Sequence, residues 1–137
     1  MARIELSDLR HAYGPRPSRP EDYALKSVDL AWEDGGAYAL LGPSGCGKTT
    51  LLNIISGLVA PSEGRVLFDG RDVTYLPTEA RNIAQVFQFP VIYDTMTVYE
   101  NLSFPLRNRG VARDEIDRRV REIAGMLDHG DDLGRRA

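Results

Sequence analysis

The sequence predicts an α/β fold in which a three-layer core adjoins an antiparallel β subdomain and the start of a helical subdomain. A short apolar run bounded by glycines, residues 37–41, is followed at once by a glycine-rich loop and a helical pattern. Its length and flanks favour a buried strand, so the order is strand, loop, helix. The segment 65–73 reads as a hairpin around Asp69-Gly70, because that dipeptide suits a tight turn with positive φ. Helical signals dominate after residue 97.

Around this centre, the other elements follow from apolar spacing and turn residues. Residues 4–10 alternate loosely and predict an opening strand, and a proline-containing loop follows at 15–20. Apolar side chains then recur at Ala24, Val28 and Leu30 before the turn 33–36.

Downstream of the loop, residues 50–55 predict a helix that stops at Gly57, and residues 83–87 predict a strand leading to Gln88. Thr97 and Glu100 have the spacing of a capping box, so a helix should start there. A longer helix is expected from about 113 to 127. Its stripe of apolar residues is predicted to pack into the core, namely Ile116, Val120, Ile123 and Leu127.

Composition narrows the function classes. The 137 residues carry a formal charge of −3 and a pI near 5.4, which argues against nucleic acid as a partner. The single cysteine, Cys46, excludes an internal disulfide and suits a reducing compartment. No apolar run approaches the ~20 residues of a membrane helix. We therefore expect a soluble, cytoplasmic protein whose membrane role comes through a partner.

Residues 42–49 carry the clearest chemical signal, a glycine, four residues, then Gly-Lys-Thr: Gly42, Pro43, Ser44, Gly45, Cys46, Gly47, Lys48 and Thr49. Three glycines let the backbone turn its N–H groups toward an anion, and the helix N-terminus adds its dipole. Lys48 supplies charge for the β- and γ-phosphates, and the Thr49 hydroxyl is placed to ligate Mg²⁺. The motif in this context predicts a P-loop NTPase core rather than a glycine-rich turn with a chance lysine.

Cys46 has two interpretations inside this loop. It is a small neutral filler, the favoured one, or a thiol that ionises readily beside Lys48 and a helix N-terminus. Either way, alkylation should block nucleotide binding by its bulk.

The segment 41–52 resembles the Walker A region of ABC-transporter ATP-binding subunits. Residues 86–88 and 97–102 are similar to that family's glutamine loop and the helix after it. The resemblance implies that Tyr13 stacks on adenine, that Ser44 approaches the γ-phosphate, and that ATP and Mg²⁺ are the cofactors. It adds Thr50 to the nucleotide-binding residues. It gives catalytic roles to Lys48 and Gln88, and metal roles to Thr49 and Gln88.

The resemblance also implies partners and a domain plan. Residues 1–91 would form the ATP-binding core and β subdomain, and 92–137 the start of the helical subdomain. The partners would be transmembrane permease subunits of an importer and a second ATP-binding subunit, on the inner face of the cell membrane. The apolar run 89–93 would either pack inward or line the groove for a permease helix. The stretch 81–110 resembles importers of carbohydrates and polyols, of the sugar or glycerol type.

Three segments that the family needs for turnover have no match here: the signature, a Walker B strand ending in Asp-Glu, and the switch histidine. His11 and His129 stand in the wrong places for the switch. We therefore expect an N-terminal fragment, natural or engineered, that binds Mg-ATP without hydrolysing it. The alternative is a non-catalytic nucleotide-binding module that regulates or competes with a full-length subunit. A small-molecule P-loop kinase is disfavoured by the hairpin and by Gln88 with its helix.

Overall fold

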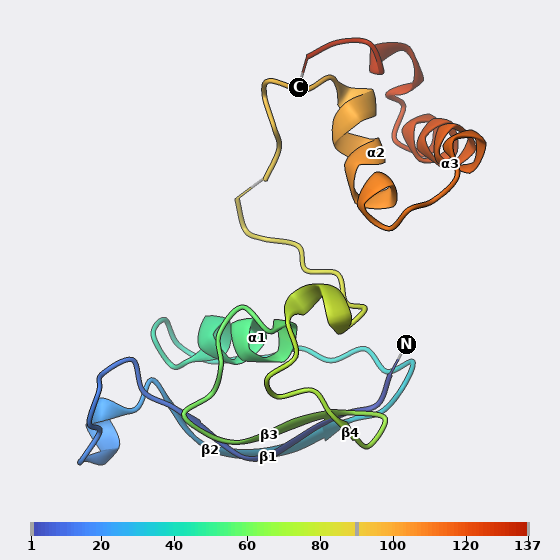
Figure 1. Cartoon of the computed structure of the whole chain (residues 1–137). Coiled ribbons are helices and arrows are strands. Elements are labelled where there is room, and N and C mark those ends of the chain that lie inside the picture. Colours follow the sequence, from blue (N-terminus) through green and yellow to red (C-terminus); the bar gives the residue numbers. More distant parts are fainter. Residues whose placement is uncertain (1, 90, 137) are drawn as a thin grey trace. The chain divides into compact units, whose positions relative to one another are not determined.

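A computed structural model describes residues 2–89 and 91–136 (Figure 1). The chain divides into two compact units, Met1–Gln85 and Val86–Ala137, and each is described by itself. The predicted boundary between subdomains, near residue 91, stays a prediction.

The first unit is built on a four-stranded antiparallel sheet in the order β2-β1-β3-β4. The strands are β1 (Ile4–His11), β2 (Leu25–Trp32), β3 (Glu63–Phe68) and β4 (Arg71–Asp72). The central strand β1 pairs through Leu6 with Leu30 of β2 and with Val66 of β3. The antiparallel sheet and its hairpin confirm the sequence prediction. The turn uses positive φ at both Asp69 (50°) and Gly70 (76°), as a two-residue hairpin requires.

Helix α1 (Lys48–Ser56) lies on one face of this sheet (Figure 1). Its Leu51, Ile54 and Ile55 join side chains from the strands in one buried cluster, which contains Leu6, Leu9, Leu25, Val66, Phe68 and Val73. The helix ends at Gly57 with φ 84°, which confirms the predicted stop. A short 3-10 turn, η1 (Pro20–Asp22), interrupts the loop before β2, and η2 (Thr78–Ala80) follows the hairpin.

Two predicted strands are not formed. Residues 37–41 and 83–87 have no strand assignment, and Leu41 and Val86 are 88% and 97% exposed. A strand exists only through hydrogen bonds to a neighbour. Across the described parts of the chain, neither segment pairs with another strand. Instead, Tyr38 stacks on Trp32 and its hydroxyl accepts a hydrogen bond from the Glu33 amide at 2.9 Å.

The second unit contains α2 (Val98–Asn108), α3 (Arg113–Met126) and the 3-10 turn η3 (Gly130–Asp132). Helix α2 starts with the predicted capping box. The Thr97 hydroxyl accepts a bond from the Glu100 amide at 3.2 Å, and the Glu100 carboxylate accepts one from the Thr97 amide at 2.8 Å. In the apolar run before this helix, Phe89, Val91 and Ile92 are exposed and do not pack inward, whereas the ring of Tyr93 packs against Phe104 of α2 at 5.4 Å. Pro90 lies outside the described residues.

The predicted apolar stripe of α3 is half wrong. Ile116 and Val120 are buried as expected, but Ile123 and Leu127 are exposed. The buried side continues through Ala124 instead, so it follows the i, i+4 row of the helix. Ala124 was absent from the predicted stripe because its small side chain gives a weaker apolar signal than isoleucine, valine or leucine.

Glu115 on α3 carries a prediction about acid. Its carboxylate accepts two hydrogen bonds from Arg118, at 2.8 and 2.9 Å, and one from Arg119, and these lower its pKa from 4.5 to about 2. Because the pKa of Glu115 is lower in the folded helix than in the unfolded chain, the ionised carboxylate stabilises the helix above pH 4.5. This stabilisation is lost as the pH falls toward 2 and the carboxylate is protonated. We expect helical ellipticity to fall over this window, and to fall less in Glu115→Gln.

The control for this titration is Glu122→Gln. It removes the bond between Arg118 and Glu122 but leaves both arginines on Glu115. It should titrate like the wild type from pH 4.5 to 2. Identical acid curves for Glu115→Gln and wild type would contradict the prediction.

Candidate functional site

The loop 42–49 joins the exposed segment 37–41 to the first turn of α1. Residues 42–46 are exposed, Gly47 and Lys48 are half-buried, and Thr50 is buried. Gly47 is the N-cap of the helix, with φ 99°. The first-turn amides of α1 therefore point into an exposed loop, the arrangement that binds anions at helix N-termini.

Gly47 also places the loop against the sheet. A Cβ at this position would lie 2.6 Å from the carbonyl oxygen of Ala24, just before β2. Only glycine can pass this close to another backbone. The predicted need for glycine is thus explained here by two features, the positive φ and the contact with Ala24.

Lys48 reaches back over the loop. Its Nζ donates to the carbonyl oxygens of Gly42 at 2.6 Å and Pro43 at 2.7 Å, and lies 3.6 Å from the Cys46 sulfur. The ammonium thus lies within the curl of the loop, on the same side as the thiol. A lysine so placed is a mobile point charge whose bonds to exposed carbonyls can exchange for bonds to a phosphate.

Cys46 is exposed, and its side chain lies next to Gly42, the first residue of the loop. A Cβ on Gly42 would come within 2.5 Å of its sulfur, so the two ends of the loop are in close contact there. Any group added to this sulfur must occupy space beside the Lys48 ammonium.

Tyr13 lies next to the end of the loop, although 28 or more residues separate them in sequence. Its hydroxyl is 3.1 Å from the Thr50 hydroxyl, while its ring is 67% exposed and meets His11 edge-on at 4.6 Å. The structure therefore brings together two predicted site residues, Tyr13 and Thr50, and leaves ring surface open for stacking. Its contact with adenine stays a prediction.

The two predicted metal ligands fall in different units. Thr49 is exposed on the first turn of α1, and Gln88 belongs to the second unit. Their shared role in binding Mg²⁺ therefore stays a prediction. Within residues 2–89 and 91–136, no three His, Cys, Asp or Glu side chains gather as a metal cluster. The Thr49 hydroxyl suits Mg²⁺, which commonly takes one or two protein ligands and completes its shell with phosphates and water.

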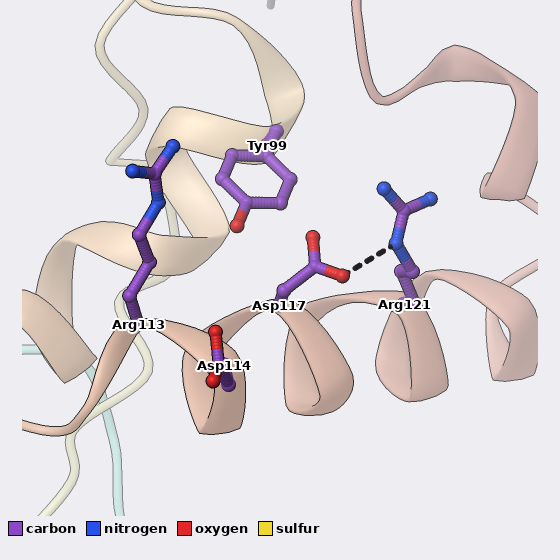
Figure 2. A pocket seen from close by; sticks show the side chains of 5 residues that line it. All are labelled: Tyr99, Arg113, Asp114, Asp117 and Arg121. Atoms are coloured by element: carbon purple, nitrogen blue, oxygen red, sulfur yellow. Dashed lines mark hydrogen bonds and ion pairs between the residues drawn. The ribbon is translucent and has the colours of Figure 1, made fainter.

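Apart from the loop, a pocket lies in the second unit, between α2 and α3. It measures about 520 Å³, and Figure 2 shows Tyr99 facing Asp117 with Arg113 and Arg121 on either side. The hydrogen bond from Arg121, 2.9 Å long, and the positive charge of that residue hold the pKa of Asp117 below its ordinary value. Two arginines and two aspartates, Asp114 included, balance in charge. The pocket therefore offers no net charge to an anion.

Arg81 is the buried residue that sequence reasoning missed. It appeared only in a stretch resembling sugar-type importers, yet its side chain is 5% exposed and donates four hydrogen bonds to backbone carbonyls. No periodicity marks such a residue, because its partners are main-chain atoms.

Among the described helices, none is both long and apolar enough to cross a bilayer.

Known proteins resemble this chain in both sequence and fold. A family model described as ABC transporter matches residues 25–137. The sn-glycerol-3-phosphate import ATP-binding protein UgpC 1 of Rhizobium etli is 46% identical over 99% of the chain. The trehalose/maltose import ATP-binding protein MalK of Thermococcus litoralis is 43% identical over 93% of it. The chain spans 38% and 34% of these two relatives.

A solved structure of an ATP-binding cassette of an ABC transporter matches with a TM-score of 0.79 and 26% identity, over 99% of the chain and 58% of that structure. The predicted fold class, part of such an ATPase domain, is thereby confirmed.

Proposed function

This chain belongs to the ABC transporter family, and from that premise we propose that it binds Mg-ATP as part of the energy-coupling subunit of an importer. The observation that carries the proposal is the loop 42–49 with its ammonium inside the curl and Tyr13 against its far end. A phosphate chain and an aromatic base are the two recognition elements of ATP that such a pair can hold.

The residues divide the work by chemistry. Amides of the loop and of the first turn of α1 would hold the phosphates, and Lys48 would exchange its two carbonyl bonds for phosphate oxygens. The exposed Thr49 hydroxyl would ligate Mg²⁺, and Ser44 would approach the γ-phosphate. Bound Mg²⁺ would neutralise charge on the phosphates.

Turnover and transport belong, in this proposal, to a longer protein. Gln88 would sense the γ-phosphate and link the nucleotide to a permease, and a second ATP-binding subunit would complete the catalytic site. The protein would then work at the cytoplasmic face of the cell membrane through its permease partners. The absence of matches to the signature, Walker B and switch-histidine segments supports binding without hydrolysis for these 137 residues.

The transported solute is proposed to be a sugar or a polyol phosphate. The two relatives described above are named for import of sn-glycerol-3-phosphate and of trehalose or maltose. The support for this solute class comes from those names and not from the nucleotide site.

The test is a calorimetric titration of the chain with Mg-ATP, followed by a steady-state hydrolysis assay on the same sample. We expect saturable binding and no turnover. Failure of a folded sample to bind would overturn the proposal. Turnover that disappears with Lys48 would instead overturn the claim that this chain lacks the catalytic half.

Alkylation of Cys46 gives an independent prediction. A maleimide adduct on this exposed sulfur would fill the space beside the Lys48 ammonium, 3.6 Å away. We expect complete modification to weaken Mg-ATP binding about tenfold or more, measured by fluorescence titration. Cys46→Ser, treated with the same reagent, should bind as its untreated sample does. Unchanged affinity of the fully modified chain would contradict this prediction.

A further inference from the structure

The two ends of α1 are held very differently. At its N-terminus the loop 42–46 is exposed, and Lys48 bonds back to the loop itself. At its C-terminus, the carbonyl oxygens of Ile54 and Ile55 are bound by a buried side chain from outside the helix. The C-terminal end of the helix, which lies away from the predicted phosphate site, is therefore held through its own carbonyls by a residue outside the helix.

That side chain is Arg81. Its Nη1 donates to Ile54 O at 2.8 Å and to Ile55 O at 2.9 Å, its Nη2 to Thr74 O at 2.9 Å, and its Nε to Leu76 O at 2.9 Å. Every nitrogen of the planar guanidinium thus has a backbone partner. One side of the fork binds the last turn of α1, and the other binds the chain leaving the β3–β4 hairpin.

The charge of Arg81 is stabilised by carbonyls alone. No carboxylate lies within ion-pair distance of it among the residues that the structure describes. Burial lowers its pKa, as expected for a desolvated cation. The C-terminal carbonyls of a helix carry partial negative charge, so a cation placed there is favoured. Ile54 O already accepts a bond from the Gly57 amide at 3.1 Å, and Arg81 adds a second donor there and a donor for Ile55 O.

The anchor on the hairpin side is rigid. Thr74 is 2% exposed, and its hydroxyl bonds the Val66 amide of β3 at 2.9 Å and the Asp72 carboxylate at 2.6 Å. The Thr74 hydroxyl and the Thr74 amide both donate to Asp72, and these two bonds hold the pKa of Asp72 below its ordinary value. Thr74, whose carbonyl oxygen accepts a hydrogen bond from Arg81, is therefore bonded to the sheet.

We propose that Arg81 is a positioning residue of the nucleotide site, which aims the N-terminus of α1 by clamping its C-terminus to the β3–β4 hairpin. The nine residues of α1 span about 13 Å at 1.5 Å per residue. A tilt of about 10° at the clamp would therefore move Lys48 and the first-turn amides by roughly 2 Å, enough to spoil several aligned hydrogen bonds.

This inference rests on the proposed binding of Mg-ATP. The test compares wild type, Arg81→Lys and Leu9→Ala by calorimetric titration, at a temperature where circular dichroism shows all three fully folded. Lysine keeps the charge but loses the planar fork. Leu9 lies at 0% exposure on β1 and contributes to the same core, so its truncation controls for lost stability without touching the clamp.

We expect Arg81→Lys to weaken Mg-ATP affinity about tenfold and Leu9→Ala to change it less than about twofold. Wild-type affinity in Arg81→Lys, or an equal loss in both variants, would overturn the positioning role and leave the proposed function standing. No binding by the folded wild type would overturn the function itself and the positioning role with it.

If Arg81→Lys does not fold, Gly57→Ala supplies the same test with Arg81 retained. A methyl at Gly57 would lie 2.6 Å from Nε and 2.9 Å from Cζ of Arg81, so the guanidinium must shift away from its carbonyls. The affinity should again fall about tenfold. An unchanged affinity in this variant would also overturn the role.

Discussion

Replacing Lys48 by alanine should weaken Mg-ATP binding about tenfold to just over a hundredfold while leaving the chain folded. A hydrogen bond to a charged group is worth about 1.5–3 kcal/mol, and the Lys48 ammonium would make its bonds to fully charged phosphates. In the free chain it bonds two carbonyl oxygens of an exposed loop, so its loss should cost little stability. Calorimetric titration and thermal unfolding measure the two quantities on one preparation.

Lys26 provides the matched control. It is the only other lysine in the sequence, and it lies exposed on β2. Lys26→Ala removes the same charge from the same unit, so a general electrostatic effect on an anionic ligand would appear in both variants. Equal losses of affinity in the two would refute a specific role for Lys48.

Gly64→Ala should be the most damaging single substitution in the sheet, with a loss of about 3 kcal/mol or more in the free energy of unfolding. Gly64 has φ 84°, which costs a non-glycine residue about 1–2 kcal/mol. A Cβ there would also lie 2.3 Å from the Asp8 carbonyl oxygen, in the backbone of β1. Asp8 itself has φ 45°, at a shift in the pairing of β1 with β3, so neither strand can move without losing further bonds.

Gly70→Ala separates the two causes. Gly70 has a similar φ of 76°, but among the described residues no atom outside its own chain neighbours lies within 4 Å of the position that a Cβ would take. This variant should lose about 1–2 kcal/mol, the conformational cost alone. Urea unfolding of both variants measures the difference. Equal losses would mean that the contact with Asp8 contributes nothing.

Elements with local signals were predictable from sequence. The capping box at Thr97, the Asp-Gly turn and the stop at Gly57 each depend on residues within one or two turns of one another. The predictions of strands at 37–41 and 83–87 were wrong. An apolar run indicates that a segment prefers burial, but it does not indicate which strand the segment will pair with. On α3, Ala124 continues the buried row that Ile123 was expected to continue.

The site divides in the same way. The loop 42–49 is contiguous, so its residue types and order suffice to predict a phosphate site. The hydroxyls of Tyr13 and Thr50 meet across 37 residues of sequence. The family resemblance assigned both residues to the nucleotide site but predicted no contact between them. Arg81 and its carbonyl partners on α1 lie up to 27 residues apart and leave no pattern in the side chains between them. Long-range contacts to main-chain atoms need coordinates.

The exposed segments around residues 41 and 86–89 have a practical consequence for work with this chain. Leu41, Val86 and Phe89 present apolar surface that water solvates poorly, and none of the three belongs to a paired strand within the described residues. Such surfaces attract one another, so the purified chain should form soluble oligomers as it is concentrated. Light scattering should rise with protein concentration, and charged substitutions at Leu41 and Val86 should extend the range over which it stays monodisperse.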